Sequence, residues 1–168
     1  REYKRVRKKL DFNDMIKQLI EKESLPRFKV IFIDEAQDLS PLQWKLFDKL
    51  KEHTDDIYLA GDDDQAIFAW AGADVDRFIS QKADQEKVLK YSKRISRAVQ
   101  EQSEIPIEKI EGLRKQKDYY PRDYEGECEY INNLDHVDLT TGRWVILTRT
   151  ISRLVSMKKE LRERNLYY

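Results

Sequence analysis

The sequence predicts an α/β fold, in which a parallel β-sheet is flanked by helices. Two short apolar runs, residues 29–33 and residues 57–60, have the composition of β-strands. The segment between them opens with a helix-start pattern and continues with apolar residues at helical spacing. A strand, a helix and a strand within about thirty residues form a βαβ unit, which makes the two strands parallel.

The first element along the chain is a helix expected over residues 10–22, because its apolar residues recur at helical spacing. Pro26 follows shortly after its end. The strand at 29–33 comes next, and its Val-Ile-Phe-Ile run alternates too little for an exposed antiparallel strand. We therefore expect this strand to be covered on both faces.

The helix between the two strands has a strong start signal. Ser40 has the character of an N-cap, Pro41 occupies the first helical position, and Gln43 stands three residues after the cap. The helix continues through Leu50, and the strand at 57–60 follows it. The sequence thus supplies each part of the βαβ unit.

The remaining elements are shorter. Residues 111–127 are rich in Lys, Asp, Tyr, Gly and Pro, and we interpret them as a linker or inter-domain passage. The other expected elements are a helix over 74–81, a strand over 87–89, a helix from 96 to 103 ended by Ile105-Pro106, strands over 128–131 and 144–147, and a helix over 152–164.

Composition excludes several classes of protein. Lys+Arg and Asp+Glu both number 32, so the net charge of zero argues against binding nucleic acid by bulk charge, although a stacking surface needs none. No apolar run approaches the ~20 residues of a membrane span. The single cysteine, Cys128, excludes an internal disulfide, and no Cys/His cluster has metal-ligand spacing. We expect a cytoplasmic protein that contacts no membrane.

Two acidic motifs follow the two strands. Asp34 and Glu35 come directly after the first strand, and Asp62 to Gln65 follow the second. Because parallel strands end at the same sheet edge, where ligands bind in open α/β folds, the motifs should converge on one site. A carboxylate there can hold Mg²⁺, and its neighbour can deprotonate an attacking water. The alternative is a pair of solvated acids that end a strand.

These runs resemble motifs of a known family. Residues 34–38 (Asp-Glu-Ala-Gln-Asp) and residues 61–73 (Gly-Asp-Asp-Asp-Gln-Ala-Ile-Phe-Ala-Trp-Ala-Gly-Ala) resemble motifs II and III of superfamily 1 DNA helicases of the UvrD/Rep/PcrA type. Residues 10–16 resemble the helix that precedes motif II in that family, and residues 89–95 resemble motif IV. Residues 145–153 resemble the "vLyRTNaqSR" segment of its second motor domain.

The resemblance implies a partial RecA-like fold of the P-loop NTPase type. Residues 1–110 would hold the later half of the first RecA-like motor domain, and residues 128–168 the start of the second. The chain would be the central fragment of a 3′-to-5′ translocase and helicase that uses ATP and Mg²⁺ on single-stranded DNA. We expect a monomer. The chain has no G-x-x-x-x-G-K-[ST] loop, so we expect negligible ATPase activity from it alone.

The resemblance also assigns roles in hydrolysis. Asp34 would coordinate Mg²⁺, and Glu35 would be the catalytic base. Gln65 would sense the γ-phosphate, and Asp62 would help to link the nucleotide to the DNA track. Arg94 would be the arginine finger that stabilises charge on the transferring phosphoryl group. The alternative for Arg94 is an ordinary surface arginine, since Lys93 stands where the family usually has an aromatic residue.

Further residues match positions that contact DNA. Phe68 and Trp70 match aromatic residues on which single-stranded bases stack, and core packing is the alternative. Ala71 stands where many relatives have arginine. Arg149 and Arg153 match positions that could touch DNA phosphates, and a solvated or helix-capping role is the alternative.

A DEAD-box RNA helicase fits poorly, because that class has Asp-Glu-Ala-Asp where this chain has Gln37 at the fourth position. The competing hypothesis is a helicase-like module that binds DNA or a protein without hydrolysing ATP. The missing phosphate-binding loop and the absence of the family's later motifs V and VI from these 168 residues favour it.

Overall fold

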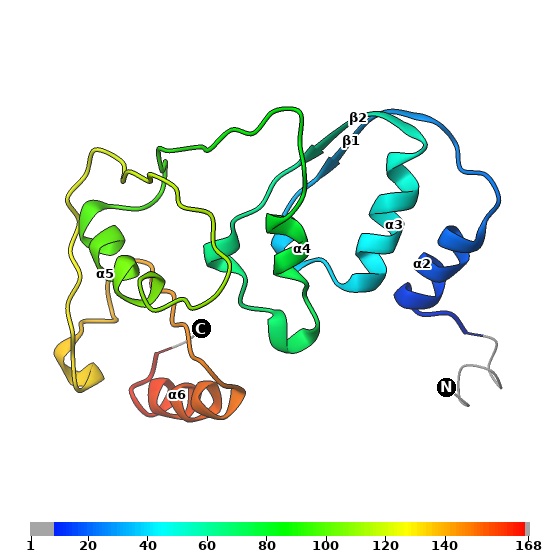
Figure 1. The fold of residues 1–168 in the computed structure, drawn as a ribbon. Helices are drawn as coiled ribbons and strands as arrows, with labels where there is room; N and C mark the ends of the chain where they lie inside the picture. The colour runs from blue at the N-terminus through cyan, green and yellow to red at the C-terminus, as the bar shows by residue number, and fades with distance from the viewer. Residues whose placement is uncertain (1–8, 167–168) are drawn as a thin grey trace. The chain divides into compact units, whose positions relative to one another are not determined.

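The computed structural model of the chain describes residues 9–166. They belong to two compact units that divide between residues 127 and 128. The first unit contains the β-sheet and most of the helices, and the second contains helix α6 (Figure 1). The candidate nucleotide-site residues Asp34, Glu35, Asp62, Gln65 and Arg94 all lie in the first unit.

The sheet consists of two parallel strands, β1 (Phe28–Ile33) and β2 (Thr54–Leu59), paired from Phe28↔Thr54 to Ile33↔Leu59. This pairing confirms the prediction that the strands are parallel. Backbone hydrogen bonds extend it beyond the strands: Ala60 N–H donates to the Ile33 carbonyl at 2.8 Å, and Ala36 N–H donates to the Ala60 carbonyl at 2.9 Å. The two strands therefore end at the same edge.

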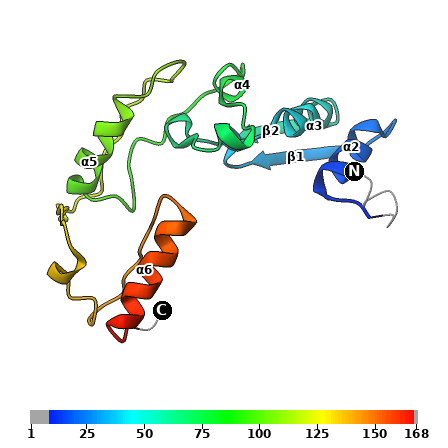
Figure 2. The ribbon, with the colours of Figure 1, turned by 90° about the horizontal axis from the view of Figure 1, so that it is seen from below.

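Helix α3 (Pro41–Lys51) connects the strands and contacts β2, and it lies alongside the sheet in both ribbon views (Figures 1 and 2). Its capping box is the predicted one, with Ser40 N–H donating to Gln43 Oε1 at 2.9 Å. Trp44 and Phe47 are buried and meet edge to face at 5.3 Å between ring centroids. These two aromatic side chains are the centre of the small core.

Helix α2 (Phe12–Glu21) packs against α3 and is slightly shorter than the predicted range. Asp11 caps it, and the backbone N–H of Asp14 donates to Asp11 Oδ1 at 2.9 Å. The Asp14 side chain in turn accepts the Asp11 N–H through Oδ2 at 3.2 Å. The reciprocal cap explains why the helix starts at Phe12 and not at Leu10.

The expectation of a strand covered on both faces is wrong for β1. Ile31 and Ile33 lie on a half-buried face, whereas Phe32 and Tyr58 stack on the other face at 4.9 Å between ring centroids. Phe32 is 75% exposed and Tyr58 57% exposed. The apolar run suited a covered strand, but within the described residues 9–127 of the first unit no element covers that face.

The expected strands over 87–89, 128–131 and 144–147 do not form within the described part of the chain. Residues 128–131 and 144–147 are largely exposed, with Leu147 88% exposed. A strand needs a neighbour to receive its backbone hydrogen bonds, and apolar composition does not supply one. Close to 87–89, Tyr91 and Tyr120 form an isolated bridge.

Short elements complete the first unit. Helix α4 (Val75–Ile79) is capped by Asp74, and helix α5 (Arg97–Ile107) passes through Pro106 where an end was expected. Pro106 lies in the last turn of the helix, and the Glu108 N–H beyond it still donates to the Glu104 carbonyl at 2.9 Å. Single 3₁₀ turns, η1 (Ala36–Asp38), η2 (Asp63–Gln65) and η3 (Ala69–Ala71), lie between β1 and α4.

Residues 111–127 contain no helix or strand of their own, and they belong to the first unit. Their backbone is bound to residues 90–98. Tyr120 N–H donates to the Lys90 carbonyl at 2.7 Å, and Arg122 N–H donates to the Ile95 carbonyl at 2.9 Å. This attachment fixes where the side chains of the segment lie.

The second unit contains the 3₁₀ turn η4 (Leu134–His136) and helix α6 (Ile151–Glu163). Thr150 caps α6, close to the predicted start. Every helix among residues 9–166 is too short or too polar to span a bilayer.

Candidate functional site

The carboxyl end of β1 presents Asp34 and Glu35, both exposed. Glu35 has φ 52° and ψ 42°, in the left-handed region that non-glycine residues rarely adopt. Its N–H donates to Asp34 Oδ1 at 2.9 Å. Such conformations persist where the surroundings hold them, and they cluster at functional sites.

Gln37 joins the ends of the two strands. The side chain is 1% exposed. Its Nε2 donates to Glu35 Oε2 at 2.7 Å, and its Oε1 accepts the Asp62 N–H at 3.1 Å. Only this orientation of the amide gives each partner the group it needs. A Cβ on Gly61 would stand 2.7 Å from Gln37 Oε1, so a glycine is needed there for the two motifs to approach.

The 3₁₀ turn η2 continues this connection to Gln65. Asp62 caps the turn, and its Oδ1 accepts the Asp64 N–H at 3.2 Å. Gln65 Nε2 donates to Asp62 Oδ2 at 2.6 Å, while the residue as a whole stays exposed. Glu35, Gln37, Asp62 and Gln65 thus form one hydrogen-bonded chain across the carboxyl edge of the sheet.

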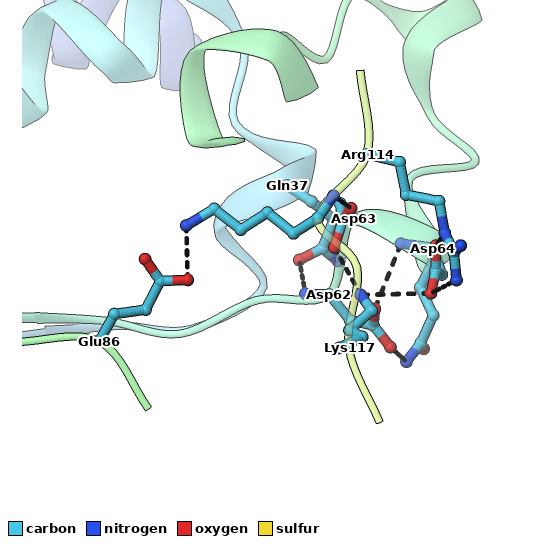
Figure 3. A network of polar contacts seen from close by, with 9 residues as sticks. Gln37, Asp62, Asp63, Asp64, Glu86, Arg114 and Lys117 are labelled. Atoms are coloured by element: carbon cyan, nitrogen blue, oxygen red, sulfur yellow. Dashed lines mark hydrogen bonds and ion pairs between the residues drawn. The ribbon is translucent and has the colours of Figure 1, made fainter. Parts of the chain in front are cut away.

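Three consecutive carboxylates lie in this turn, and two basic side chains from residues 111–127 neutralise them (Figure 3). Arg114 binds Asp64 through two nitrogens, with Nε 2.5 Å from Oδ1 and Nη2 3.0 Å from Oδ2. Lys117 Nζ forms ion pairs with Asp62, with Asp63 at 2.5 Å and with Asp64 at 3.3 Å. We name Asp62, Asp63 and Asp64 the acidic triplet.

The charges of the triplet and its partners stabilise one another. Burial alone would raise the pKa of Asp64, but the hydrogen bond from Arg114 and the charge of Lys117 lower it below its ordinary value. Burial likewise opposes the charge on Lys117, yet the bonds to Asp62 and Asp63 raise its pKa. The bond to Asp64 raises the pKa of Arg114.

Asp34 remains the candidate for holding a divalent cation in this arrangement. Within residues 9–166 no group of three or more His, Cys, Asp or Glu side chains could hold a metal. Mg²⁺ needs no such cage, because one or two carboxylates together with substrate phosphates suffice. Asp34 fits that requirement as an exposed carboxylate, whereas the acidic triplet is already bound to Lys117 and Arg114.

Arg94 is not brought into this network. Its backbone N–H donates to Ser92 Oγ at 3.1 Å, and the residue is exposed. Its guanidinium makes no hydrogen bond or ion pair with any residue in the part of the chain that the structure describes. Ser92, by contrast, is buried, and its hydroxyl also accepts the Ile95 N–H at 2.9 Å.

Phe68 and Trp70 lie at the 3₁₀ turn η3, a few residues after the acidic triplet. Their ring centroids are 6.4 Å apart, with the ring planes tilted by 48°. Trp70 is 84% exposed and Phe68 43% exposed. Neither ring is buried in the core, and Trp70 has an accessible face.

In the second unit, Arg149 precedes α6 and is exposed. Arg149 and Arg153 line an open cavity of about 520 Å³ together with Ser152 and Glu160. The cavity lining therefore combines two guanidinium groups with hydroxyl groups and a carboxylate.

A model of the UvrD/REP helicase N-terminal domain matches residues 1–86, about half of the chain. The chain belongs to this family. The match contains β1, α3, β2 and the acidic triplet, so the predicted resemblance to UvrD/Rep/PcrA-type helicases is confirmed.

Relatives of this UvrD/REP family chain include two ATP-dependent DNA helicases and a subunit of the RecBCD enzyme. ATP-dependent DNA helicase PcrA of Bacillus subtilis (strain 168) is 29% identical over 161 residues, which cover 80% of this chain and 22% of that protein. ATP-dependent DNA helicase Rep of Buchnera aphidicola subsp. Baizongia pistaciae is 34% identical over 84 residues, covering 45% of this chain and 12% of the relative. The RecBCD subunit RecB of Escherichia coli (strain K12) is 34% identical over 94 residues, with coverage of 48% and 8%.

The chain thus spans about a fifth or less of the length of these relatives. Sequence reasoning placed the two acidic motifs of the UvrD/REP domain but missed the roles of Gln37, Arg114 and Lys117. For the basic pair a signal was available, since the Arg114-Lys115-Gln116-Lys117 run complements three adjacent aspartates. Their pairing joins positions fifty or more residues apart, so the local pattern did not indicate which acidic run the basic run would contact.

Proposed function

We propose that the chain supplies part of the ATP-hydrolysing site and part of the single-stranded DNA track of a 3′-to-5′ DNA helicase. The observation that carries the proposal is the hydrogen-bonded chain from Glu35 through Gln37 and Asp62 to Gln65. It joins a candidate base to a candidate phosphate sensor at the edge where α/β folds bind ligands. The ATP-dependent helicases named among the relatives support the same activity.

In the proposed mechanism Glu35 orients the attacking water and takes its proton. The left-handed backbone and the bond from Gln37 fix where its carboxylate lies. Asp34 would hold Mg²⁺, which when bound neutralises charge on the nucleotide phosphates. Gln65, held by Asp62, would donate to the γ-phosphate from the other strand end.

The same fragment would contact DNA through aromatic rings. Trp70 and Phe68 would stack on bases, which grips any sequence and lets the strand step. The exposure of Trp70 supports this role over core packing. Arg149 would bind a DNA phosphate through its guanidinium.

We further propose a RecA-like fold of the P-loop NTPase type, with residues 1–110 in a first motor domain and residues 128–168 beginning a second. The parallel βαβ unit supports the first assignment, and the division of the chain at residue 127 is compatible with the second. Arg94 would act as the arginine finger once nucleotide is bound, and its exposed guanidinium leaves it available.

The test is Glu35→Gln in the full-length protein. The variant should lower DNA-stimulated ATP turnover by about 10²–10⁴-fold, the usual contribution of a general base, while single-stranded DNA binding is retained. Glu52→Gln, at the exposed C-cap of α3, is the matched control and should leave turnover unchanged. Turnover of Glu35→Gln equal to that of the control would refute the assignment of the base.

The second candidate is a module that binds DNA or a protein without hydrolysing ATP. The 168 residues contain no G-x-x-x-x-G-K-[ST] loop, and the second candidate applies if the full-length protein has none. It predicts that the full-length protein binds single-stranded DNA with the same affinity with and without ATP, and has no turnover.

A further inference from the structure

We propose that Lys117, assisted by Arg114, is a positioning residue of the hydrolytic site, because it holds the turn Asp62–Gln65 in the form that presents Gln65. The proposal rests on the proposed function above and deepens it. Lys117 is not placed in contact with nucleotide, and it acts through Asp62.

The geometry places the Lys117 ammonium among three carboxylates (Figure 3). The side chain is only 17% exposed, although lysine is normally solvated. The side chains of Asp63 and Asp64 are even less exposed, at 5% and 9%. Lys115 N–H donates to Asp63 Oδ2 at 2.8 Å, so the backbone of the same segment also binds the triplet.

Asp62 is the link between this cluster and Gln65. Its Oδ1 accepts from Lys117 Nζ and from the Asp64 N–H, and its Oδ2 accepts from Gln65 Nε2. The ammonium therefore fixes the Asp62 carboxylate in the orientation that binds Gln65. Without it, three adjacent carboxylates would repel one another and the turn would open.

The charge state supports a permanent structural role. The bonds to Asp62 and Asp63 raise the pKa of Lys117 despite its burial, so the ammonium stays charged at neutral pH. The Lys117 Nζ also lies among the carboxylate oxygens to which a metal cation would otherwise bind. The triplet is thus held by a side chain of the protein, which leaves Asp34 as the carboxylate open to a metal.

The experiment compares Lys117→Met with Lys115→Met in the full-length protein. Lys115 is the matched control, because its side chain pairs with the exposed Glu86 and its contact with Asp63 uses only the backbone. Lys117→Met should lower kcat for ATP about 10–100-fold, the usual cost of removing a supporting partner, with KM changed less than about threefold. Lys117→Arg should recover most of the kcat.

A second measurement reports on the turn itself. Hydrogen exchange of the Asp64, Gln65 and Ala66 amides, which are bonded within the turn, should accelerate at least about tenfold in Lys117→Met and stay unchanged in Lys115→Met. Equal exchange and equal kcat in the two variants would overturn the inference. If Lys117→Met does not fold, Arg114→Gln, which removes the two bonds to Asp64, takes its place with the same expected results.

The two proposals fail in different ways. A wild-type protein without ATP turnover refutes the proposed function, and hydrogen exchange then still decides whether Lys117 holds the turn. A wild-type protein with turnover and an unaffected Lys117→Met variant refutes the role of Lys117 alone.

Discussion

The carboxyl edge of the sheet and the 3₁₀ turn η3, where Phe68 and Trp70 lie, are close in sequence but differ in how their side chains are held. At the edge, Gln37 is buried and bonded on both sides, and the Gln65 amide is bonded to Asp62. At η3, Trp70 is 84% exposed, and its ring plane is tilted by 48° relative to that of Phe68. Phosphate chemistry needs groups fixed to within a fraction of an ångström, whereas base stacking needs an accessible ring. The two regions match these two requirements.

The strongest way to break the comparison is Gln37→Leu. Leucine keeps most of the volume but leaves the Asp62 N–H and Glu35 without their partner, so the free energy of unfolding should fall by about 1–3 kcal/mol. In the full-length protein kcat should fall about 10–100-fold as Glu35 loses its support. Urea unfolding and ATP turnover measure both effects.

The matched control for this variant is Gln116→Leu, because Gln116 is exposed. That substitution should change stability by less than about 0.5 kcal/mol. A Gln37→Leu variant as stable as Gln116→Leu would mean that the edge is not held by its buried amide.

Trp70→Ala tests the other side of the comparison. Binding of single-stranded DNA should weaken by about 1–3 kcal/mol, the value of one stacked base, with stability changed by less than about 0.5 kcal/mol. Trp144→Ala is the control, since Trp144 is also exposed. Fluorescence anisotropy with labelled oligonucleotide measures the affinity. Substantial unfolding by Trp70→Ala would instead indicate that the ring packs as core.

The smallest effect concerns pH and sharpens the role of the acidic triplet. The pKa of Asp64 is lowered in the folded state from an ordinary 3.8, so this carboxylate stabilises the fold above that pH. The contribution is lost as pH falls below 3.8 towards the lowered pKa. The stability difference between wild type and Asp64→Asn should therefore shrink in that window, as followed by urea unfolding at successive pH values. A constant difference would contradict the ion pairing.

Local signals predicted most of the helices and the parallel strand pair. The Ser40–Gln43 cap and the apolar runs specify α3, β1 and β2 through contacts within a few residues. The convergence of Asp34–Glu35 with Asp62–Gln65 followed from topology, because parallel strands end together. The roles assigned to these residues remain predictions.

Other features depend on contacts that sequence patterns do not encode. Residues 144–147 have strand composition, but they join no sheet within the described residues 9–166. Lys117 reaches Asp62 across 55 positions, and only the three-dimensional path of residues 111–127 brings them together. The bridging role of Gln37 needed the positions of both strand ends.

The left-handed backbone of Glu35 has a consequence for engineering. At φ 52° a glycine would satisfy the backbone better than any side chain, so the carboxylate is kept against the local preference of the chain. Selection for thermostability alone would favour losing the acid at this position. A thermostabilised descendant of this protein therefore needs an activity screen at residue 35, because Glu35 is the proposed catalytic base.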